Sequence, residues 1–299
     1  MILEIRDDFD LRRIADSGQC FRWARSGGGW RILSGDRCLH ISPCPDGRYA
    51  LDCTEADFAA VWRDYFDLSE DYAAIRARID PADAFLLTAA AQQKGIRILR
   101  QAPWETLVSF IISQNKNIPA IRRAIENLAE ACGDARTDAA GEAYYAFPSP
   151  EALAALDDEA LRRCGLGYRC AYVRAAAEAV CSGALDLDAL RDAEESRAME
   201  ALTGLHGVGV KVASCVSLFG LHHLNAFPQD VWIKRILARE YPAGYPFSAY
   251  APWNGVYQQY MFAYDRARAH AGTENILDSD PERAIMDIEK ALPISGSAR

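Results

Sequence analysis

The sequence of 299 residues contains no apolar stretch long enough to cross a lipid bilayer, which argues against a membrane-spanning protein. Its N-terminus, MILEIRDDFD, is acidic and has no long apolar segment, so we do not expect a secretion signal. Basic residues are also scarce, because 33 lysines and arginines face 42 aspartates and glutamates, for a net charge of −9. This balance disfavours a protein that coats nucleic acid, although it does not exclude a local basic surface.

Paired cysteines are missing as well. The nine cysteines are scattered without a Cys-x-x-Cys spacing, and none follows Cys215. An odd, unpatterned set without a secretion signal indicates free thiols in a reducing cytoplasm. We therefore expect a cytoplasmic protein without a disulfide framework, and no metal is needed to explain the cysteine count.

The composition that remains, with half the residues hydrophobic and a quarter charged, is typical of a globular protein, and the length suggests two domains. Residues 1–53 alternate short aromatic or β-branched runs with Gly- and Pro-rich turns, as antiparallel hairpins do. Residues 55–92 become helical, with one apolar stripe, and from about residue 95 the pattern is helical nearly throughout. We predict an α+β fold with an N-terminal antiparallel β domain with helices (1–94) and a helical domain (95–294). The stripe consists of Phe58, Val61, Trp62 and Tyr65.

Several helix boundaries can be read directly. Pro103 and Pro150 stand where first-turn prolines are tolerated, and Ser149 is a favoured N-cap. Gly133 and Gly165 follow apolar repeats and predict helix ends. A last helix is expected at 281–291.

The segment LHGVGVKVASC (205–215) places Gly207 and Gly209 at the entrance of an apolar helix. Glycines there permit a tight turn and leave backbone N–H groups uncovered, and such groups at a helix N-terminus bind anions such as phosphate. Residues 202–220 therefore predict a helix-hairpin-helix that grips a DNA backbone without reading its sequence. A glycine-tightened helix corner that binds nothing is the alternative.

Lys211 lies in the first turn of that helix, where the helix dipole disfavours a cation. The position suits an amine nucleophile, because the dipole and partial burial both favour the neutral amine. An ordinary exposed lysine on a helix rim is the alternative. Asp230, in FPQDVW, follows nineteen residues later and could be simply an N-cap, or could also direct its second oxygen at a positive sugar.

Five blocks in order along the chain resemble the signature blocks of 8-oxoguanine DNA glycosylases, within the helix-hairpin-helix glycosylase superfamily. They are DSGQCFRW (16–23), SFIISQNKNI (109–118), GLGYRCAYV (165–173), GVGVKVASC (207–215) and FPQDVW (227–232). The resemblance spans residues 10 to 270 and implies a bacterial-type enzyme, expected to be monomeric, whose partner is double-stranded DNA containing 8-oxoguanine.

The resemblance also implies catalytic and base-pocket roles. Lys211 would attack C1′ and form a Schiff base that permits strand cleavage by β-elimination, and Asp230 would stabilise the positive sugar. Gly18 would accept, through its backbone carbonyl, the N7–H that 8-oxoguanine has and guanine lacks. Gln259 would read the Watson–Crick edge of the base. The other expected pocket residues are Cys215, which would pack near Lys211, Pro228 and Phe262.

On the DNA side, the resemblance implies that Asn115 fills the space left by the extruded nucleotide, that Tyr168 wedges into the stack and that Arg169 donates to the orphaned base. The remaining expected DNA-binding residues are Asn117, Gly207, Gly209 and Trp232. Without the ordered blocks, Tyr168 could be a core aromatic, Asn115 a helix C-cap and Gln259 one polar residue on an amphipathic helix.

The chain departs from the family pattern at three positions. Ala120 replaces an arginine that reads the opposite cytosine, so we expect a weaker cytosine preference. Ala263 aligns with an aromatic lid over the base, with Phe262 one residue away. Trp232 replaces a histidine thought to contact phosphate.

Endonuclease III and adenine-specific mismatch glycosylases carry four clustered cysteines after the hairpin, and no cysteine follows Cys215 here, so we expect no iron–sulfur cluster. A monovalent cation on the hairpin carbonyls is allowed. Two rival functions are an alkylated-base glycosylase of the same superfamily, which usually lacks the hairpin lysine, and a non-catalytic DNA-binding protein.

Overall fold

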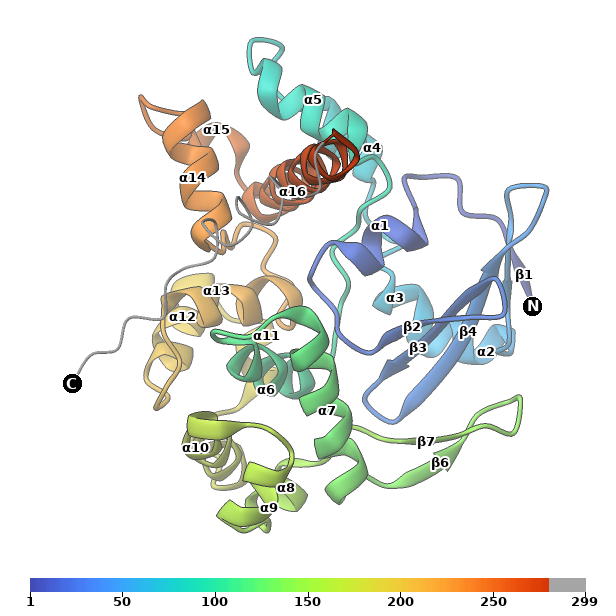
Figure 1. Cartoon of the computed structure of the whole chain (residues 1–299), viewed down its shortest axis with the longest axis vertical. Coiled ribbons are helices and arrows are strands. Elements are labelled where there is room, and N and C mark those ends of the chain that lie inside the picture. The colour runs from blue at the N-terminus through green and yellow to red at the C-terminus, as the bar shows by residue number, and fades with distance from the viewer. Residues whose placement is uncertain (280–299) are drawn as a thin grey trace.

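The computed structural model describes residues 1–279, with side chains to residue 269. It shows a five-stranded antiparallel sheet beside a larger helical body (Figure 1), so the predicted α+β class is confirmed. The expected helix at 281–291 lies outside the described residues. Within them, no helix is both long enough and apolar enough to cross a membrane.

The N-terminal sheet has the strand order β1-β5-β4-β3-β2, and Trp30 pairs with Ile41 and Ile32 with Leu39 across its central strands. These four side chains are buried, which is why the alternating apolar pattern predicted hairpins correctly. The strands are β1 (Ile2–Leu3), β2 (Trp23–Ser26), β3 (Gly29–Ser34), β4 (Arg37–Pro43) and β5 (Tyr49–Leu51).

A short helix, α1 (Leu11–Asp16), interrupts this sheet between β1 and β2, where the sequence suggested only strands and turns. Asp10 caps it by accepting a hydrogen bond from the Arg13 N–H at 3.0 Å. The helix ends just before Gly18, whose φ of +81° turns the chain toward β2. The helix therefore fixes the position of Gly18.

The helices predicted over 55–92 are present, but they belong to two different cores. Phe58, Trp62 and Tyr65 pack under the sheet, whereas Val61 is only half-buried. The helices after residue 70 pack into the helical body instead, so packing separates the two parts earlier than residue 94. The elements are α2 (Glu55–Asp57), the π-helix η1 (Phe58–Trp62), α3 (Arg63–Tyr65), α4 (Tyr72–Ala77) and α5 (Ala84–Gln92).

The helical body contains the hairpin and the remaining helices. Pro103 stands at the start of α6, Ser149 caps α8, and Gly133 follows α7, as predicted. The segment from Ser149 to Gly165 holds two helices, because Asp157 provides a second N-cap. The elements are α6 (Pro103–Ser113), α7 (Ile118–Cys132), α8 (Pro150–Ala154), α9 (Asp158–Arg163), the 3₁₀ helix η2 (Gly167–Arg169), α10 (Cys170–Cys181), α11 (Leu187–Arg191), α12 (Glu195–Thr203), α13 (Val210–Phe219), α14 (Val231–Glu240), α15 (Phe247–Tyr250) and α16 (Asn254–Ser279).

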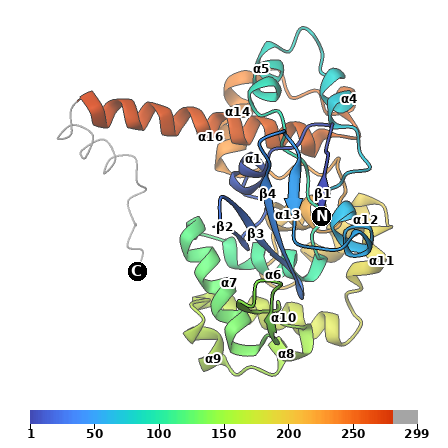
Figure 2. The ribbon, with the colours of Figure 1, turned by 90° about the vertical axis from the view of Figure 1, so that its right-hand side faces the viewer.

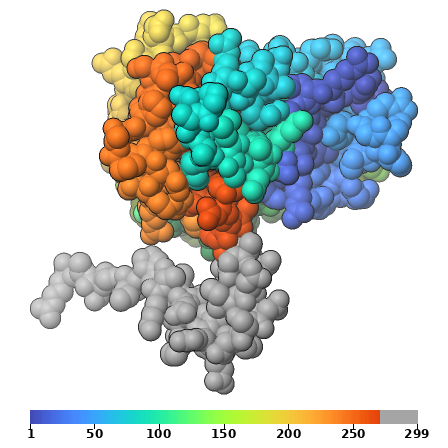
Figure 3. All heavy atoms as spheres, turned by 90° about the horizontal axis from the view of Figure 1, so that it is seen from above, coloured from blue at the N-terminus to red at the C-terminus, as the bar shows by residue number. Residues whose placement is uncertain are grey.

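The long helix α16 crosses the molecule and ties distant segments together. It packs against α5 and α14, and seen from above these three elements form one continuous surface (Figures 2 and 3). Because α16 also reaches Gly18 through Phe262, it connects the helical body with the N-terminal part.

The expectation of helix nearly throughout after residue 95 is wrong at one place. Strands β6 (Ala135–Thr137) and β7 (Ala143–Tyr145) form an exposed two-stranded ribbon next to the N-terminal sheet (Figure 1). Its residues are mostly polar or small and carry little strand signal. Contacts with the sheet stabilise it, such as the hydrogen bond from Arg22 to the Tyr145 carbonyl at 2.8 Å.

Candidate active site and DNA interface

The two hairpin glycines differ in how strictly the structure requires glycine at their positions. Gly207 has a φ of +82°, and a Cβ there would lie 2.1 Å from the Tyr172 ring, so no other residue fits without rearrangement. Gly209 has an ordinary φ of −88° and open space around its Cβ position; it is the N-cap residue of α13 and makes no side-chain cap. The first N–H groups of α13 therefore have no side-chain acceptor, as expected for an anion site.

A cavity of about 720 Å³ lies beside the hairpin, and we call it the hairpin groove. The structure brings together here four residues that the sequence predicted to bind DNA. Asn115 donates to the Tyr168 hydroxyl at 3.1 Å, and Tyr168 is 53% exposed, so it is not a core aromatic. The lining residues are Gln114, Asn115, Tyr168, Tyr172, Thr203, Leu205, His206, Gly207, Val208 and Gly209.

Asn115 adopts a left-handed conformation, with a φ of +50°, one residue after the C-cap of α6. Gln114 stabilises this turn, because its side-chain amide donates to the Gly207 carbonyl at 3.1 Å. The Asn115 turn and the hairpin are therefore joined directly, although 93 residues separate them.

The other three residues predicted to contact DNA do not line the hairpin groove. Arg169 is buried, stacks on Tyr168 and donates to the carbonyls of Gln114 and Leu166, so it supports the groove rather than projecting from it. Asn117 caps α7 by accepting from the Ala120 N–H at 2.9 Å. Trp232 is half-buried on α14 and does not line the hairpin groove.

Lys211 is half-buried in the first turn of α13, with its Nζ 5.4 Å from the centroid of the Phe110 ring. Cys215 lies one turn later and is buried. Burial raises the pKa of the Cys215 thiol to about 11, with the charge of Lys211 opposing and that of Asp230 adding to the effect. Lys211 and Asp230 therefore both lie close enough to the Cys215 sulfur to influence its ionisation.

Asp230 does cap its helix, because its Oδ1 accepts from the Ile233 N–H at 2.9 Å. This hydrogen bond holds Oδ1 in place, and the orientation of the carboxylate then determines where Oδ2 lies. The cap and a second role are compatible, since a carboxylate offers two oxygens.

The predicted base-reading residue Gln259 is buried on α16. Its amide nitrogen donates to the Gln258 side-chain oxygen at 2.9 Å, and Gln258 donates to the Pro228 carbonyl at 3.0 Å. The Gln259 Oε1 atom is buried without a hydrogen-bond partner among the described residues. Such an unsatisfied acceptor is costly unless a ligand supplies a donor.

A second cavity, of about 780 Å³, opens where Gly18 meets α7 and α16, and we call it the Gly18 cavity. Two aromatic rings stand between this cavity and Lys211: Phe21 lines the cavity and lies 5.5 Å from Phe110, and the Lys211 Nζ lies 5.4 Å from Phe110. The lining residues are Asp10, Arg12, Arg13, Ala15, Asp16, Gly18, Cys20, Phe21, Gln92, Gln93, Ile118, Arg122, Ala263, Arg266 and Ala267.

The position of the expected aromatic lid involves two neighbouring residues, Phe262 and Ala263, which lie differently. Ala263 lines the Gly18 cavity, as its alignment suggested, and leaves it open. The Phe262 ring lies 3.4 Å from the Cβ position of Gly18, with the Arg266 guanidinium 5.3 Å from the ring centroid. The aromatic surface near Gly18 therefore comes from Phe262.

Sequence reasoning missed Gln114, Tyr172 and Arg122, although all three line these cavities. Gln114 and Tyr172 lie inside signature blocks and could have been found there. Arg122 follows Ile118 by one helical turn on a partly apolar face, a signal shared by many solvated arginines.

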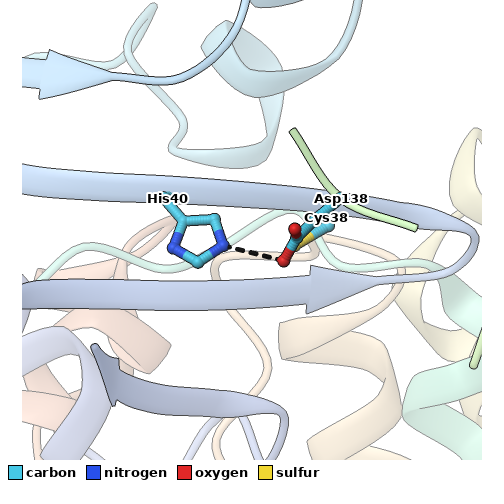
Figure 4. Close-up of side chains that lie close together, drawn as sticks. All are labelled: Cys38, His40 and Asp138. Carbon is cyan, nitrogen blue, oxygen red and sulfur yellow. Dashed lines mark hydrogen bonds and ion pairs between the residues drawn. The ribbon is translucent and has the colours of Figure 1, made fainter. Parts of the chain in front are cut away.

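One group in the described part of the chain has the residue types of a metal site, namely Cys38, His40 and Asp138 (Figure 4). Asp138 Oδ2 already contacts His40 Nε2 at 3.0 Å and accepts from Arg31 at 2.9 Å, while its Oδ1 accepts two backbone N–H groups. Burial raises the pKa of the Cys38 thiol to about 11, which disfavours the thiolate a metal needs. These contacts instead attach the β6–β7 ribbon to the N-terminal sheet.

Two family models match consecutive parts of the chain. Residues 1–107 match the 8-oxoguanine DNA glycosylase N-terminal domain, and residues 108–244 match the HhH-GPD superfamily of base excision DNA repair proteins. The solved structure of MBOgg1 in complex with a low-affinity DNA ligand is 38% identical, with 90% of this chain and 96% of that chain covered and a TM-score of 0.84. The chain belongs to the 8-oxoguanine DNA glycosylase family.

Other members of the family resemble the chain over different lengths. The Clostridium acetobutylicum 8-oxoguanine glycosylase/lyase, in complex with DNA that has cytosine opposite 8-oxoguanine, is 32% identical, with 90% of this chain and 98% of that chain covered and a TM-score of 0.81. The N-glycosylase/DNA lyase of Saccharomyces cerevisiae is 43% identical over 159 residues, which are 50% of this chain and 42% of the yeast protein. This chain therefore spans less than half of that curated relative.

Proposed function

We propose that this protein excises 8-oxoguanine from double-stranded DNA and then cleaves the strand at the abasic sugar. The observation that supports this most directly is Lys211, placed in the first turn of the hairpin helix with its amine beside Phe110 and near Asp230. A hairpin that only grips DNA needs no half-buried lysine at that point.

The chemistry follows from an amine at the sugar. The neutral Lys211 Nζ attacks C1′ as the bond from C1′ to the base breaks, and the departing base takes a proton. The amine nitrogen loses its proton and the sugar ring opens, which leaves a Schiff base between Lys211 and C1′. Loss of a C2′ proton then expels the 3′ phosphate oxygen and nicks the strand.

Asp230 stabilises the positive charge that develops on the sugar as the base leaves. Its Oδ1 is held by the Ile233 N–H, so the carboxylate is oriented before the reaction begins. Preorganised charge of this kind lowers the barrier because little reorganisation is needed during the reaction.

Recognition of the base uses two acceptors, the backbone carbonyl of Gly18 and the buried Oε1 of Gln259. The Gly18 carbonyl accepts the N7–H of 8-oxoguanine, which guanine lacks. The unpartnered Oε1 of Gln259 accepts from the Watson–Crick edge, which would remove its desolvation cost. Guanine leaves the first acceptor unpaired and is disfavoured.

The hairpin groove holds the DNA. Backbone N–H groups of α13 bind a phosphate, Asn115 occupies the position of the extruded nucleotide, and the exposed Tyr168 ring enters the base stack. Direct DNA contacts by Asn117 and Trp232 stay predictions, and Arg169 supports the groove from its buried position. We further propose that the protein acts as a monomer in the cytoplasm, with no iron–sulfur cluster and at most a monovalent cation on the hairpin carbonyls.

The test is borohydride trapping on a duplex with a single 8-oxoguanine, with Lys211→Gln and the matched control Lys94→Gln, an exposed lysine paired with Asp8. We expect a covalent adduct with the native protein and the control, and none with Lys211→Gln, whose strand cleavage should fall at least about 1000-fold.

Two other outcomes would redirect the proposal. Release of free base without an adduct would point to a route through Asp230 alone, as in the alkylated-base enzymes of the superfamily. Binding without base release by the native protein would favour a non-catalytic DNA-binding protein.

A further inference from the structure

Arg122 stands out among the cations around the Gly18 cavity. Its Nε is buried without a partner, and no hydrogen bond or ion pair of its guanidinium occurs among the described residues. Leaving a buried donor unsatisfied is costly, and more so when the group is charged. The buried Nε can therefore donate a hydrogen bond to an acceptor that the described part of the chain does not supply.

The other arginines of the cavity are already engaged. Arg12 pairs with Asp16 at 3.6 Å and Arg13 with Asp10 at 3.8 Å, each at the exposed rim. Arg266 stacks over Phe262. Arg122 is thus the lining cation whose hydrogen-bonding capacity remains open in this part of the chain.

Arg122 lies at the Gly18 cavity and not at the hairpin groove. It lies one helical turn after Ile118 on α7, and both residues line the Gly18 cavity. Its charge lowers the pKa of the Cys20 thiol against the dominant effect of burial, which raises that pKa to about 12. The guanidinium therefore acts on a sulfur in the interior, close to Gly18.

The two acidic groups that also line the cavity, Asp10 and Asp16, are engaged at its rim by Arg13 and Arg12. An acceptor for Arg122 must then come from what enters the cavity. An oxidised guanine carries carbonyl oxygens on its edges, and a guanidinium is a strong donor to such oxygens.

We propose that Arg122 is a specificity-determining residue that donates a hydrogen bond to a carbonyl oxygen of the extruded 8-oxoguanine. This inference rests on the proposed function and deepens it. Arg122 lines the Gly18 cavity and not the hairpin groove, and its unpartnered Nε is buried, so a base inserted beside Gly18 fits better than a backbone phosphate held at the groove.

The residue expected to read the opposite strand lies elsewhere. Ala120 occupies the position of the family arginine, and it is two residues before Arg122 on the same helix, hence on another face. Ala120 does not line the Gly18 cavity. Arg122 therefore does not replace the missing arginine.

The experiment compares Arg122→Met with the matched control Arg123→Met, which changes the next, exposed residue of α7. Single-turnover base release is measured on a duplex with 8-oxoguanine, and strand cleavage on the same duplex with an abasic site, which lacks the base. We expect Arg122→Met to slow base release about 10- to 100-fold and to leave abasic cleavage within about twofold, because only the first substrate presents the carbonyl oxygen. Arg122→Lys should recover part of the rate.

The outcomes separate the two proposals. Equal base release by Arg122→Met and Arg123→Met overturns the role of Arg122. A parallel loss of abasic cleavage, or a loss that depends on the opposite base, also overturns it and assigns Arg122 to the DNA backbone or the other strand. Thermal unfolding of both variants is measured beside the two activities, so that a folding defect is recognised independently of them. Failure of the native protein to release 8-oxoguanine would instead overturn the proposed function.

Discussion

The hairpin groove and the Gly18 cavity are built in opposite ways. The groove lies wholly within the helical body, and its turn is shaped by backbone conformation at Gly207 and Asn115. The Gly18 cavity is assembled from α1, the turn at Gly18, the end of α5, α7 and α16, which come from both cores. One region is formed within a single core, and the other requires segments of both cores to pack together.

This difference matches two tasks of the proposed function, which are holding the DNA backbone and selecting one damaged base. Every DNA duplex presents the same backbone, so a groove of exposed N–H groups and an aromatic side chain can hold it without discrimination. Selecting one damaged base requires several acceptors and donors at fixed positions, which only a packed cavity supplies. Changes in the groove should therefore affect all DNA alike, and changes around the cavity should affect damaged bases alone.

The largest expected effect is that of Asp230→Asn, which acts at the reacting sugar and lines neither the groove nor the Gly18 cavity. Asparagine still caps α14 through its side-chain oxygen, so stability should change by less than about 0.5 kcal/mol. Base release should fall about 100-fold or more, because the negative charge near the sugar is lost. Thermal unfolding and single-turnover excision check both parts. If Asp230→Ala and Asp230→Asn lose activity only in proportion to their stability, the carboxylate is a cap alone.

The groove can be broken by a matched pair of glycine substitutions. Gly207→Ala places a methyl group against the Tyr172 ring at a positive φ and should cost about 1–3 kcal/mol of folding stability. Gly209→Ala meets open space and should stay within about 0.5 kcal/mol.

Chemical unfolding measures the stability of the two variants, and titration with damaged and with undamaged duplex measures their binding. We expect Gly207→Ala to weaken binding to damaged and undamaged DNA equally. A loss restricted to damaged DNA would contradict the division between groove and cavity.

Opposite-base preference provides a smaller effect. With Ala120 in place of the family arginine, excision of 8-oxoguanine should differ by no more than about threefold among the four opposite bases, since a direct contact to the opposite base is missing. Excision rates on four duplexes measure this, and Ala120→Arg should increase the preference for cytosine. A steep cytosine preference in the native protein would show that another residue reads that strand.

The smallest expected effect concerns the contact between the two parts that enclose the cavity. Glu105 on α6 accepts from the Gly35 N–H at 2.7 Å, and burial raises the pKa of its carboxyl from 4.5 to about 6, although Arg22 opposes this. The folded state therefore holds the proton more tightly than the unfolded chain. Its contribution to stability is complete below pH 4.5 and is lost as the pH rises through 6.

Glu105→Gln keeps an acceptor for Gly35 and removes the charge, so the variant should lack this decrease, which is about 1 kcal/mol between pH 5 and pH 7.5. Urea unfolding of both proteins at pH 5 and pH 7.5 measures the difference. An identical pH dependence in the two proteins would mean that Glu105 ionises freely in the folded state.

Much of the site could be predicted because its parts are short and local. The hairpin turn, the first-turn position of Lys211 and the cap at Asp230 each depend on residues within one or two turns of each other. Arg169 shows the limit of that reasoning: its block was found, but its side chain turns inward to the carbonyls of Gln114 and Leu166. The direction of a long side chain depends on neighbours that are remote in sequence.

The β6–β7 ribbon shows the same limit for the fold. Its strands are three residues each and mostly exposed, so they carry no period that predicts a strand. Contacts with the N-terminal part stabilise them: Asp138, directly after β6, accepts from Arg31 of β3, and the Tyr145 carbonyl accepts from Arg22, directly before β2. Such pairing is decided by long-range contacts rather than by intrinsic preference.

By itself the sequence determined the α+β class, the hairpin and the pairing of a first-turn lysine with a capping aspartate, because backbone conformation, helix capping and helical periodicity act over a few residues. Only the tertiary structure decided that Phe262 rather than Ala263 lies against Gly18, that the Oε1 of Gln259 is buried without a partner, and that Arg122 faces the same cavity. These facts depend on how α7 and α16 pack against the segment before β2, and packing joins residues more than 100 positions apart.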